Sequence, residues 1–478
     1  MKLVSVRFAV LGVVSLLMLV PRQSFGQNKP SDRRAFIWPD RPTTDDPRRI
    51  PVKPGRTGPP GGIVLKGGRL FDSVKLEAYP ATVVIDGNHI TAVLPPDATN
   101  WPADAKVIDV TGETVMPGLI DMHTHLTYAN GTTPEDENLS EGAGTLRAER
   151  NLRFGIESGF TSVRSMSDLL NTSYILSEWM QRDLSPGPRL FAAGHIITGT
   201  GGHAADRPIN YMHTPEYTVQ VDGPDAWRKA VRQTFKNGAS FIKIASMFDP
   251  DEVKAAVDEA HALGLKVTCD CETFYIKWAV EAGVDMIEHP LPRTDETIRE
   301  MAEHHTESDP TLSTYETILD RPGTDQSFGT TRAGGYYGTA SRRFTVGRQQ
   351  DFDYFKKMKA AGIKMGVGTD TDLSSFEPYL SELKWFVKGG YTIPGALVAG
   401  TRTNAEMLDM ADKLGTIEVG KLADIIVVNG KPDQDLNDLR HMDKVIKDGI
   451  LMVDHGQVQL PRHIDAPLPK PSPPDDVH

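Results

Sequence analysis

Strand-like and helix-like segments alternate through the middle of the chain, and this pattern restricts the possible folds more than any other feature. Apolar runs are followed by amphipathic stretches, of which residues 251–263 and 352–361 are expected helices. The runs expected as strands are 161–164, 189–193, 241–244, 266–269, 286–289 and 364–368. Such alternation is typical of parallel α/β folds and predicts a (β/α)₈ TIM barrel. A doubly wound sheet is the alternative, although no glycine-rich phosphate turn follows the first strand.

Short alternating segments near both ends of the chain predict a second, smaller domain. Strand-like runs punctuated by Gly, Asp and Pro occupy residues 62–93 and return at 423–428 and 445–453. Runs of this kind are typical of a small sheet. We therefore predict a small β-sandwich domain formed from both chain ends. The expected boundaries are 63–118 and 412–463 for the β-sandwich domain and 119–411 for the barrel.

Three terminal segments are expected to lie outside both domains. Lys2 and Arg7 precede an apolar run at residues 8–20, and the small residues that follow indicate cleavage before Gln27. Residues 1–26 therefore predict a signal peptide and a periplasmic or secreted protein, with an uncleaved membrane anchor as the alternative. The Pro- and Arg-rich residues 27–62 predict an extended linker, and the Pro-rich residues 464–478 predict a disordered tail.

The charge balance argues against a nucleic-acid partner. Lys and Arg total 52 against 64 Asp and Glu, which gives a formal net charge of -12. Nucleic-acid phosphates require a basic surface, which this balance does not favour. The expected partner is a small-molecule substrate, with no membrane contact after signal cleavage and a homo-oligomer as a further possibility.

The chain has 2 cysteines, Cys269 and Cys271. Two cysteines separated by one residue along a strand are too poorly oriented for easy bridging. We therefore expect both to be small buried packing residues in a protein without disulfides.

Two histidines in the segment 116–125 carry the first chemical signal. Side chains alternate along a strand, so His123 and His125 are expected to point to the same side. Two imidazoles at the carboxyl end of a barrel strand are well placed to bind a metal. Paired surface histidines are the alternative interpretation of this motif.

Lys243 is the second signal, because it interrupts the apolar run 241–245, where an unpaired cation is costly to bury. A desolvated lysine can lose its proton and capture CO₂ as a carbamate, an anionic ligand able to bridge two metals. A lysine that extends from the strand end into solvent is the alternative. His289 and Asp370 follow in order, and each ends an apolar strand.

Together these motifs resemble the amidohydrolase superfamily, specifically its prolidase-like, imidazolonepropionase-related branch. The resemblance covers roughly residues 60–460 of the chain. It rests on the motifs at 117–125, 159–164, 201–203, 241–244, 283–289, 368–370 and 415–425. It implies a metal-dependent hydrolase that cuts an amide bond in a small substrate.

The resemblance also implies roles for individual residues. His123 and His125 would hold the more buried metal, carboxylated Lys243 would bridge two metals, and His289 would bind the second. Asp370 would be a ligand and the general acid/base that moves a proton from water to the leaving amine. The implied cofactor is two divalent ions, zinc first, with manganese, cobalt or iron as alternatives.

The sequence departs from the family pattern after the fifth strand. The family carries a histidine there, whereas this chain has Asp270, which we expect to act as an oxygen ligand. Alternatively, the exchange leaves the second metal weakly bound or missing. Glu272 stands where the branch often has a substrate-contacting tyrosine. His203 and Tyr315 are the expected substrate-binding residues.

Three functions remain open at this point. The first is hydrolysis of a dipeptide or an N-acyl amino acid, and the second is hydrolysis of a cyclic amide or a lactone. The third is a catalytically impaired binding protein that kept the barrel. The loops after the strands determine specificity, and the motifs do not distinguish between these substrates.

Overall fold

The computed structural model describes residues 57–128, 139–203, 205, 218–271, 274–291, 293–314 and 350–459. The predicted signal peptide, the predicted tail and most of the predicted linker lie outside these residues, as do Glu272 and Tyr315. Among the described helices, none is both long and apolar enough to cross a membrane.

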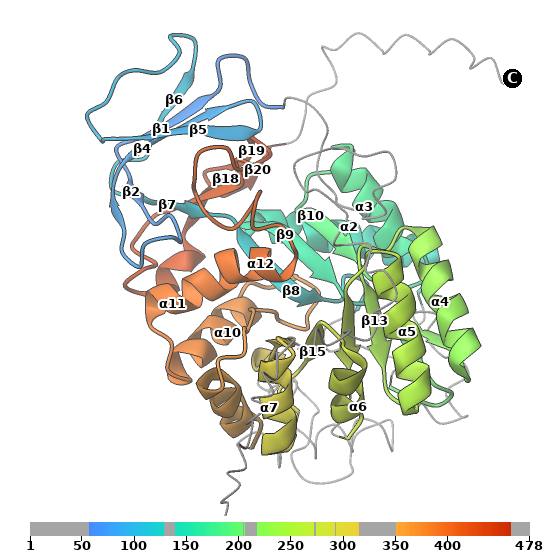
Figure 1. Ribbon diagram of the computed structural model, residues 1–478. Coiled ribbons are helices and arrows are strands. Elements are labelled where there is room, and N and C mark those ends of the chain that lie inside the picture. Colours follow the sequence, from blue (N-terminus) through green and yellow to red (C-terminus); the bar gives the residue numbers. More distant parts are fainter. Residues whose placement is uncertain are drawn as a thin grey trace, which may run out of the picture.

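Parallel strands occupy the centre of the larger domain (Figure 1). Two runs of parallel neighbours occur, β8-β9-β10 and β11-β13-β14-β15-β16, with β12 on the outer side of β11. The strands are β8 (Leu119–Thr124), β9 (Phe160–Ser165), β10 (Arg189–Ala192), β11 (Ile196–Thr198), β12 (Thr218–Gln220), β13 (Ile242–Ala245), β14 (Val267–Asp270), β15 (Met286–Glu288) and β16 (Glu307–Asp309). β10 and β11 are consecutive in the chain and separated by a short irregular stretch.

Hydrogen bonds connect these two runs at both ends. On one side, Ser240 N donates to Ala192 O (2.7 Å), next to the parallel pair of β11 and β13. On the other side, residues 364–371 lie between β16 and β8. Gly366 N donates to Ser308 O (3.0 Å), and Met122 N donates to Val367 O (3.0 Å). These single hydrogen bonds and isolated bridges link the two sheets, an arrangement compatible with the expected (β/α)₈ barrel.

Helices follow the strands and cover the outside of the barrel (Figure 1). They are α2 (Glu141–Glu157), α3 (Thr172–Gln181), α4 (Pro224–Asn237), α5 (Pro250–Ala262), α6 (Tyr275–Ala282), α7 (Asp295–Glu303), α10 (Glu377–Lys388), α11 (Ile393–Val398), η2 (Ala399–Thr403) and α12 (Asn404–Met407), with further helical residues at 350–360. Local sequence explains their ends. In α5, Asp249 and Glu252 form a reciprocal capping box and Pro250 occupies the first turn. α4 ends at Gly238, whose φ of 110° suits glycine.

The smaller domain consists of two sheets that share one hydrophobic core. The first sheet has the order β5-β4-β1-β6, and the second has the order β20-β19-β18-β17-β7-β2-β3. The strands are β1 (Ile63–Lys66), β2 (Arg69–Leu70), β3 (Tyr79–Pro80), β4 (Thr82–Asp86), β5 (His89–Leu94), β6 (Lys106–Asp109), β7 (Thr114–Pro117), β17 (Ile425–Val428), β18 (Met442–Lys447), β19 (Ile450–Asp454) and β20 (Gln457–Val458), with η3 at Leu436–Arg440. β7 and β17 pair antiparallel, which joins the two ends of the chain. An α/β fold with an additional β domain is thus confirmed.

A buried ion-pair cluster connects the two domains. Arg189 of β10 donates to Asp424 (2.6 Å) and also pairs with Asp448, two carboxylates that flank strands of the β domain. The Arg189 side chain is fully buried. Breaking such a pair leaves a buried charge without compensation, so this contact ties the β domain to the barrel strands.

The prediction of a chain without disulfides was wrong. Cys269 and Cys271 are joined by a disulfide, with their Cα atoms 5.2 Å apart. Two residues of extended strand would separate these Cα atoms by about 6.6 Å. Strand β14 ends at Asp270, so the chain bends at Cys271 and brings the two sulfurs together. Both cysteines are fully buried, as the packing interpretation expects.

Candidate metal centre

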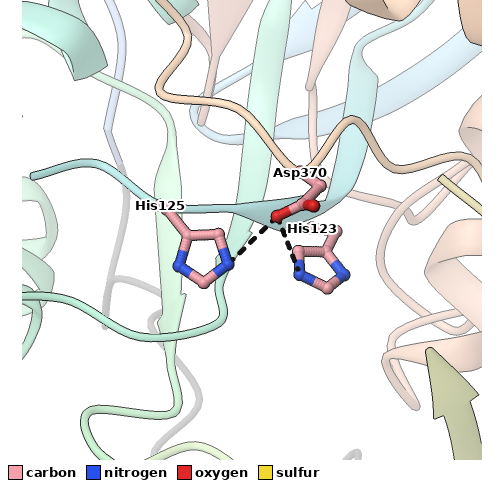
Figure 2. A group of neighbouring side chains, drawn as sticks. All are labelled: His123, His125 and Asp370. Carbon is pink, nitrogen blue, oxygen red and sulfur yellow. Dashed lines mark ion pairs between the residues drawn. The ribbon is translucent and has the colours of Figure 1, made fainter. Parts of the chain in front are cut away.

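His123 and His125 lie at the carboxyl end of β8 and face the same carboxylate (Figure 2). The Nε2 atom of His123 is 3.5 Å from Asp370 Oδ1, and that of His125 is 3.2 Å from the same oxygen. Asp370 reaches this position because its backbone N donates to His123 O (2.7 Å). The two histidines therefore point to the same side, as the alternation of side chains along a strand predicts.

Three imidazoles of the centre, those of His123, His125 and His289, are each held at Nδ1, the nitrogen that does not face a carboxylate of the centre. The Nδ1 atom of His123 is 3.0 Å from Glu288 Oε2, and that of His125 is 2.9 Å from the backbone oxygen of Ser167. The Nδ1 atom of His289 is 2.6 Å from Thr311 Oγ1. Anchoring Nδ1 leaves Nε2 directed inward, which is the usual arrangement of metal-binding histidines.

A second carboxylate, Asp270, lies at the end of β14 and has three basic neighbours. Lys243 Nζ is 3.0 Å from Asp270 Oδ2, and His203 Nε2 is 3.4 Å from the same oxygen. His289 Nε2 lies 3.3 Å from Asp270 Oδ1. The rings of His289 and His123 are 4.9 Å apart between centroids, so the two carboxylate clusters adjoin.

The structure thus brings together every predicted site residue that it describes. Their side chains form one set of contacts, in which Lys243 extends from within β13 toward residues at the carboxyl ends of other strands: His123, His125, Lys243, Asp270, His289, Asp370 and His203. Tyr315, the remaining candidate, lies outside the described residues. Paired surface histidines and a solvent-reaching lysine do not describe the site, because His123 and Lys243 are both fully buried.

Electrostatics favour the protonation states that metal ligands need. Burial lowers the pKa of His123 well below its usual value, and the charge of Lys243 lowers it further, so this imidazole is neutral. Burial would raise the pKa of Asp270, but its neighbours His203 and Lys243 hold it well below the usual value. For Asp370, His123 and the adjacent imidazoles likewise outweigh burial and lower the pKa. Both carboxylates are therefore ionised at neutral pH.

Two buried nitrogen atoms test whether the centre fits a metal. Among the described residues, His123 Nε2 and Lys243 Nζ have ion-pair contacts, with Asp370 and Asp270 respectively, but no hydrogen bond of suitable geometry. A buried polar atom normally has one, so a missing partner calls for an explanation. The ligand atoms of His123, His125 and Asp370 all lie within 4.8 Å of one another. Neutral imidazoles combined with carboxylates suit zinc and similar divalent ions, so this donor set fits a metal.

The backbone at two of these residues is in an uncommon conformation. His289 has a φ of 60° and Asp370 a φ of 54°, both in the left-handed region. Non-glycine residues rarely adopt this conformation, and such strain concentrates at functional sites. His289 follows directly after β15, and Asp370 follows the residues that bond to β16 and β8, so both positive-φ residues lie where the chain leaves the barrel.

Sequence reasoning missed the residues that hold the imidazoles. Glu288 was quoted within a motif but given no role, and Ser167 and Thr311 were not considered. Glu288 carried a signal, because a carboxylate within the apolar run 286–289 needs a buried partner. That partner is Arg164, at 2.6 Å. The Arg164 side chain is itself buried, so this ion pair gives it a role in the core of the barrel.

Comparisons with known proteins agree with this geometry. The family described as Amidohydrolase family matches residues 114–452. An imidazolonepropionase of Geobacillus kaustophilus (strain HTA426) is 25% identical over 428 residues, covering 79% of this chain and 91% of that protein. A solved Xaa-Pro dipeptidase with bound methionine in the active site is 30% identical with a TM-score of 0.73, covering 81% of this chain and 99% of that one. A solved prolidase complexed with N-methylphosphonate-L-proline is 29% identical with a TM-score of 0.72, covering 82% and 99%.

The family match extends over most of the chain and includes each strand end that contributes to the centre. The inward-facing imidazoles, the two ionised carboxylates and the buried lysine are a donor set for divalent metal ions. This protein belongs to the amidohydrolase family and is a metal-dependent hydrolase acting on carbon–nitrogen bonds.

Proposed function

We propose that this hydrolase cleaves the amide bond of a dipeptide or an N-acyl amino acid, using two divalent metal ions, most simply zinc. The observation that carries the proposal is that two neighbouring imidazoles each face an ionised carboxylate, Asp370 for His123 and Asp270 for His289. His123, His125 and Asp370 would hold one ion. Asp270, His289 and Lys243, the last as a carbamate, would complete the second site and the bridge.

Bound metal ions would supply water that is acidic near neutral pH and would polarise the scissile carbonyl. The protein's own contribution is proton transfer and orientation. Asp370 is ionised, and its side chain is 21% exposed, so it can accept a proton from water and deliver it to the leaving amine. Thr314 Oγ1 lies 3.5 Å from Asp370 Oδ2, on the side away from the imidazoles.

Substrate recognition is assigned to His203. Its side chain is 23% exposed and lies 3.4 Å from Asp270 Oδ2, so it combines access to solvent with a fixed position. A cationic or hydrogen-bonding imidazole at this rim could bind the carboxylate of an amino-acid product. Support for this substrate class comes from the solved Xaa-Pro dipeptidase and the prolidase bound to a proline phosphonate, which are similar to this chain over most of its length.

The imidazolonepropionase relatives favour a second candidate, hydrolysis of a cyclic amide. The same attack by activated water serves an open-chain or a cyclic carbonyl. A cyclic amide, unlike a dipeptide, would need no binding site for a second amino acid.

One screen separates the candidates. Purified protein reconstituted with Zn²⁺, Mn²⁺ or Co²⁺ is assayed against dipeptides that include Xaa-Pro, N-acyl amino acids and cyclic amides. We expect about two metals per chain and turnover of the first two classes, with Asp370→Asn as the inactive control. Turnover of cyclic amides alone would favour the second candidate. Tight ligand binding without metal or turnover would identify a binding protein and overturn both.

We further propose that residues 1–26 direct export to the periplasm or the medium. The basic start and the short apolar run support this assignment. Fractionation of cells expressing the full chain, with sequencing of the amino terminus of the recovered protein, is the test. An exported protein beginning at Gln27 is expected, and a cytoplasmic or membrane-bound protein with an intact amino terminus would refute it.

A further inference from the structure

Glu288 contacts the Nδ1 edge of the His123 ring, which is the edge turned away from the metal centre. Its Oε2 is 3.0 Å from His123 Nδ1, and both side chains have no exposed surface. The Nδ1 partners of the other two site imidazoles are uncharged, a backbone carbonyl for His125 and a hydroxyl for His289. His123 therefore differs from both in having an anionic carboxylate as the Nδ1 partner.

Glu288 is itself oriented through its second oxygen. Arg164 NH2 donates to Glu288 Oε1 at 2.6 Å, and the hydroxyl of Thr268 donates to the same oxygen. Oε2 is thereby directed to His123. Asp309 also lies near this ring, but its Oδ2 is 3.8 Å from His123 Nδ1, and its oxygens have no hydrogen-bond partner among the described residues. The geometry thus distinguishes Glu288 from the neighbouring carboxylate.

We propose that Glu288 is a positioning residue for His123. By accepting the Nδ1 proton it selects the tautomer whose Nε2 lone pair faces the metal centre, and its negative charge makes that nitrogen a stronger donor. Arg164 provides the opposite charge that pairs with the buried Glu288 carboxylate, at 2.6 Å. Arg164, Glu288 and His123 then form one chain of contacts from the barrel interior to the metal. This inference rests on the proposed metal centre.

The test measures Zn²⁺ affinity by competition with a chelator, using the full purified chain and no substrate. Glu288→Gln keeps the size of the side chain and removes its charge. We expect Zn²⁺ binding to weaken by about 10- to 100-fold, the usual effect of losing such a partner. Co²⁺ in place of Zn²⁺ adds an absorption spectrum, which should change in this variant because the His123 ligand is reoriented.

Asp424→Asn is the matched control. It also removes one carboxylate from a buried arginine pair, with Arg189, but at the contact between the two domains. We expect a comparable loss of stability and unchanged Zn²⁺ affinity. A purely structural role of Glu288 would instead give both variants the same metal affinity.

Thr268→Val keeps the test decisive if Glu288→Gln does not fold. It leaves the Glu288 charge in place and removes one of its two anchoring hydrogen bonds, so a smaller loss, below about tenfold, is expected. If wild type binds Zn²⁺ and the folded variants match its affinity, the positioning role is overturned while the metal centre stands. If wild type itself binds no Zn²⁺, the proposed function fails together with this inference.

Discussion

Lys243 Nζ lies 3.0 Å from Asp270 Oδ2, and both side chains are almost completely buried. The same carboxylate also contacts His203 and His289. Asp270 is therefore the shared partner of three basic groups, at the position where the resemblance to the family led us to expect a histidine. A buried carboxylate with a cationic neighbour is stable there without a metal, and it remains an oxygen donor when a metal arrives.

Asp270→Ala tests whether this carboxylate is a ligand. Removing it takes away one anionic donor and leaves Lys243 buried without its partner. We expect the loss of one metal ion per chain and a fall in kcat/KM of at least about 100-fold, because metal charge stabilises the transition state by several kcal/mol. Metal content is measured by atomic spectroscopy. Asp270→His is the restoring control and should retain or raise metal content. Equal stoichiometry and activity in Asp270→Ala would rule Asp270 out as a ligand.

Asp370→Asn separates proton transfer from folding. The amide cannot accept the proton, so kcat should fall by about 100- to 10,000-fold. Asparagine tolerates the left-handed backbone that gives Asp370 its φ of 54°, so the melting temperature should stay close to that of wild type. Steady-state kinetics and thermal unfolding are measured on the same preparations. An unchanged kcat would remove Asp370 as the acid/base.

Lys243→Ala tests the proposed carbamate. The lysine side chain is fully buried at the centre, so its removal leaves a space beside Asp270 that a small anion can enter. We expect activity to be lost and then partly restored by added acetate or propionate. Chloride at equal ionic strength is the control. A bridging carbamate would be contradicted if chloride restored activity, or if neither acetate nor propionate did.

Glu382 on α10 predicts a pH-dependent stability. Burial raises its pKa to about 8, against 4.5 as the ordinary value, and Ser313 N donates to its Oε2 at 2.6 Å. Between these two values the folded protein holds a proton that the unfolded chain has lost, so the free energy of unfolding falls as pH rises from about 4.5 to about 8. Glu382→Gln should remove this part of the pH dependence. Urea unfolding at several pH values is the measurement, and parallel curves for both proteins would contradict the assignment.

Arg189→Met addresses the contact between the domains. It removes the cation that pairs with both Asp424 and Asp448, and leaves the more distant Lys447, 3.7 Å from Asp448, to compensate two buried carboxylates. Breaking a buried pair in this way costs about 3–5 kcal/mol. The matched triple variant Arg189→Met, Asp424→Asn, Asp448→Asn should recover part of that loss, because the two carboxylates that Arg189 paired with are no longer charged. Denaturant unfolding measures the stability of the single and triple variants. Equal stability of Arg189→Met and wild type would show that the ion pairs of Arg189 contribute little.

The sequence by itself determined the fold class and most of the centre. Strand–helix alternation is a local property, and the carboxyl ends of parallel strands meet at one face of a barrel, so residues ending separate strands could be assigned to one site. His123, His125, His289 and Asp370 were found in this way, and Lys243 was found because it interrupts an apolar run. The departure at Asp270 was recognised only by comparison with the pattern of the family that the motifs resemble.

Only the tertiary structure decided which groups hold those ligands in place. The Arg164–Glu288–His123 contacts join three strands that are distant in sequence, and a hydrogen bond depends on orientations that no single segment encodes. The Cys269–Cys271 disulfide was misjudged for a related reason. Strand β14 ends at Asp270, before the second cysteine, whereas the local spacing indicated a strand that continues through both. Local patterns specify where chemistry can occur, and packing between distant segments sets its geometry.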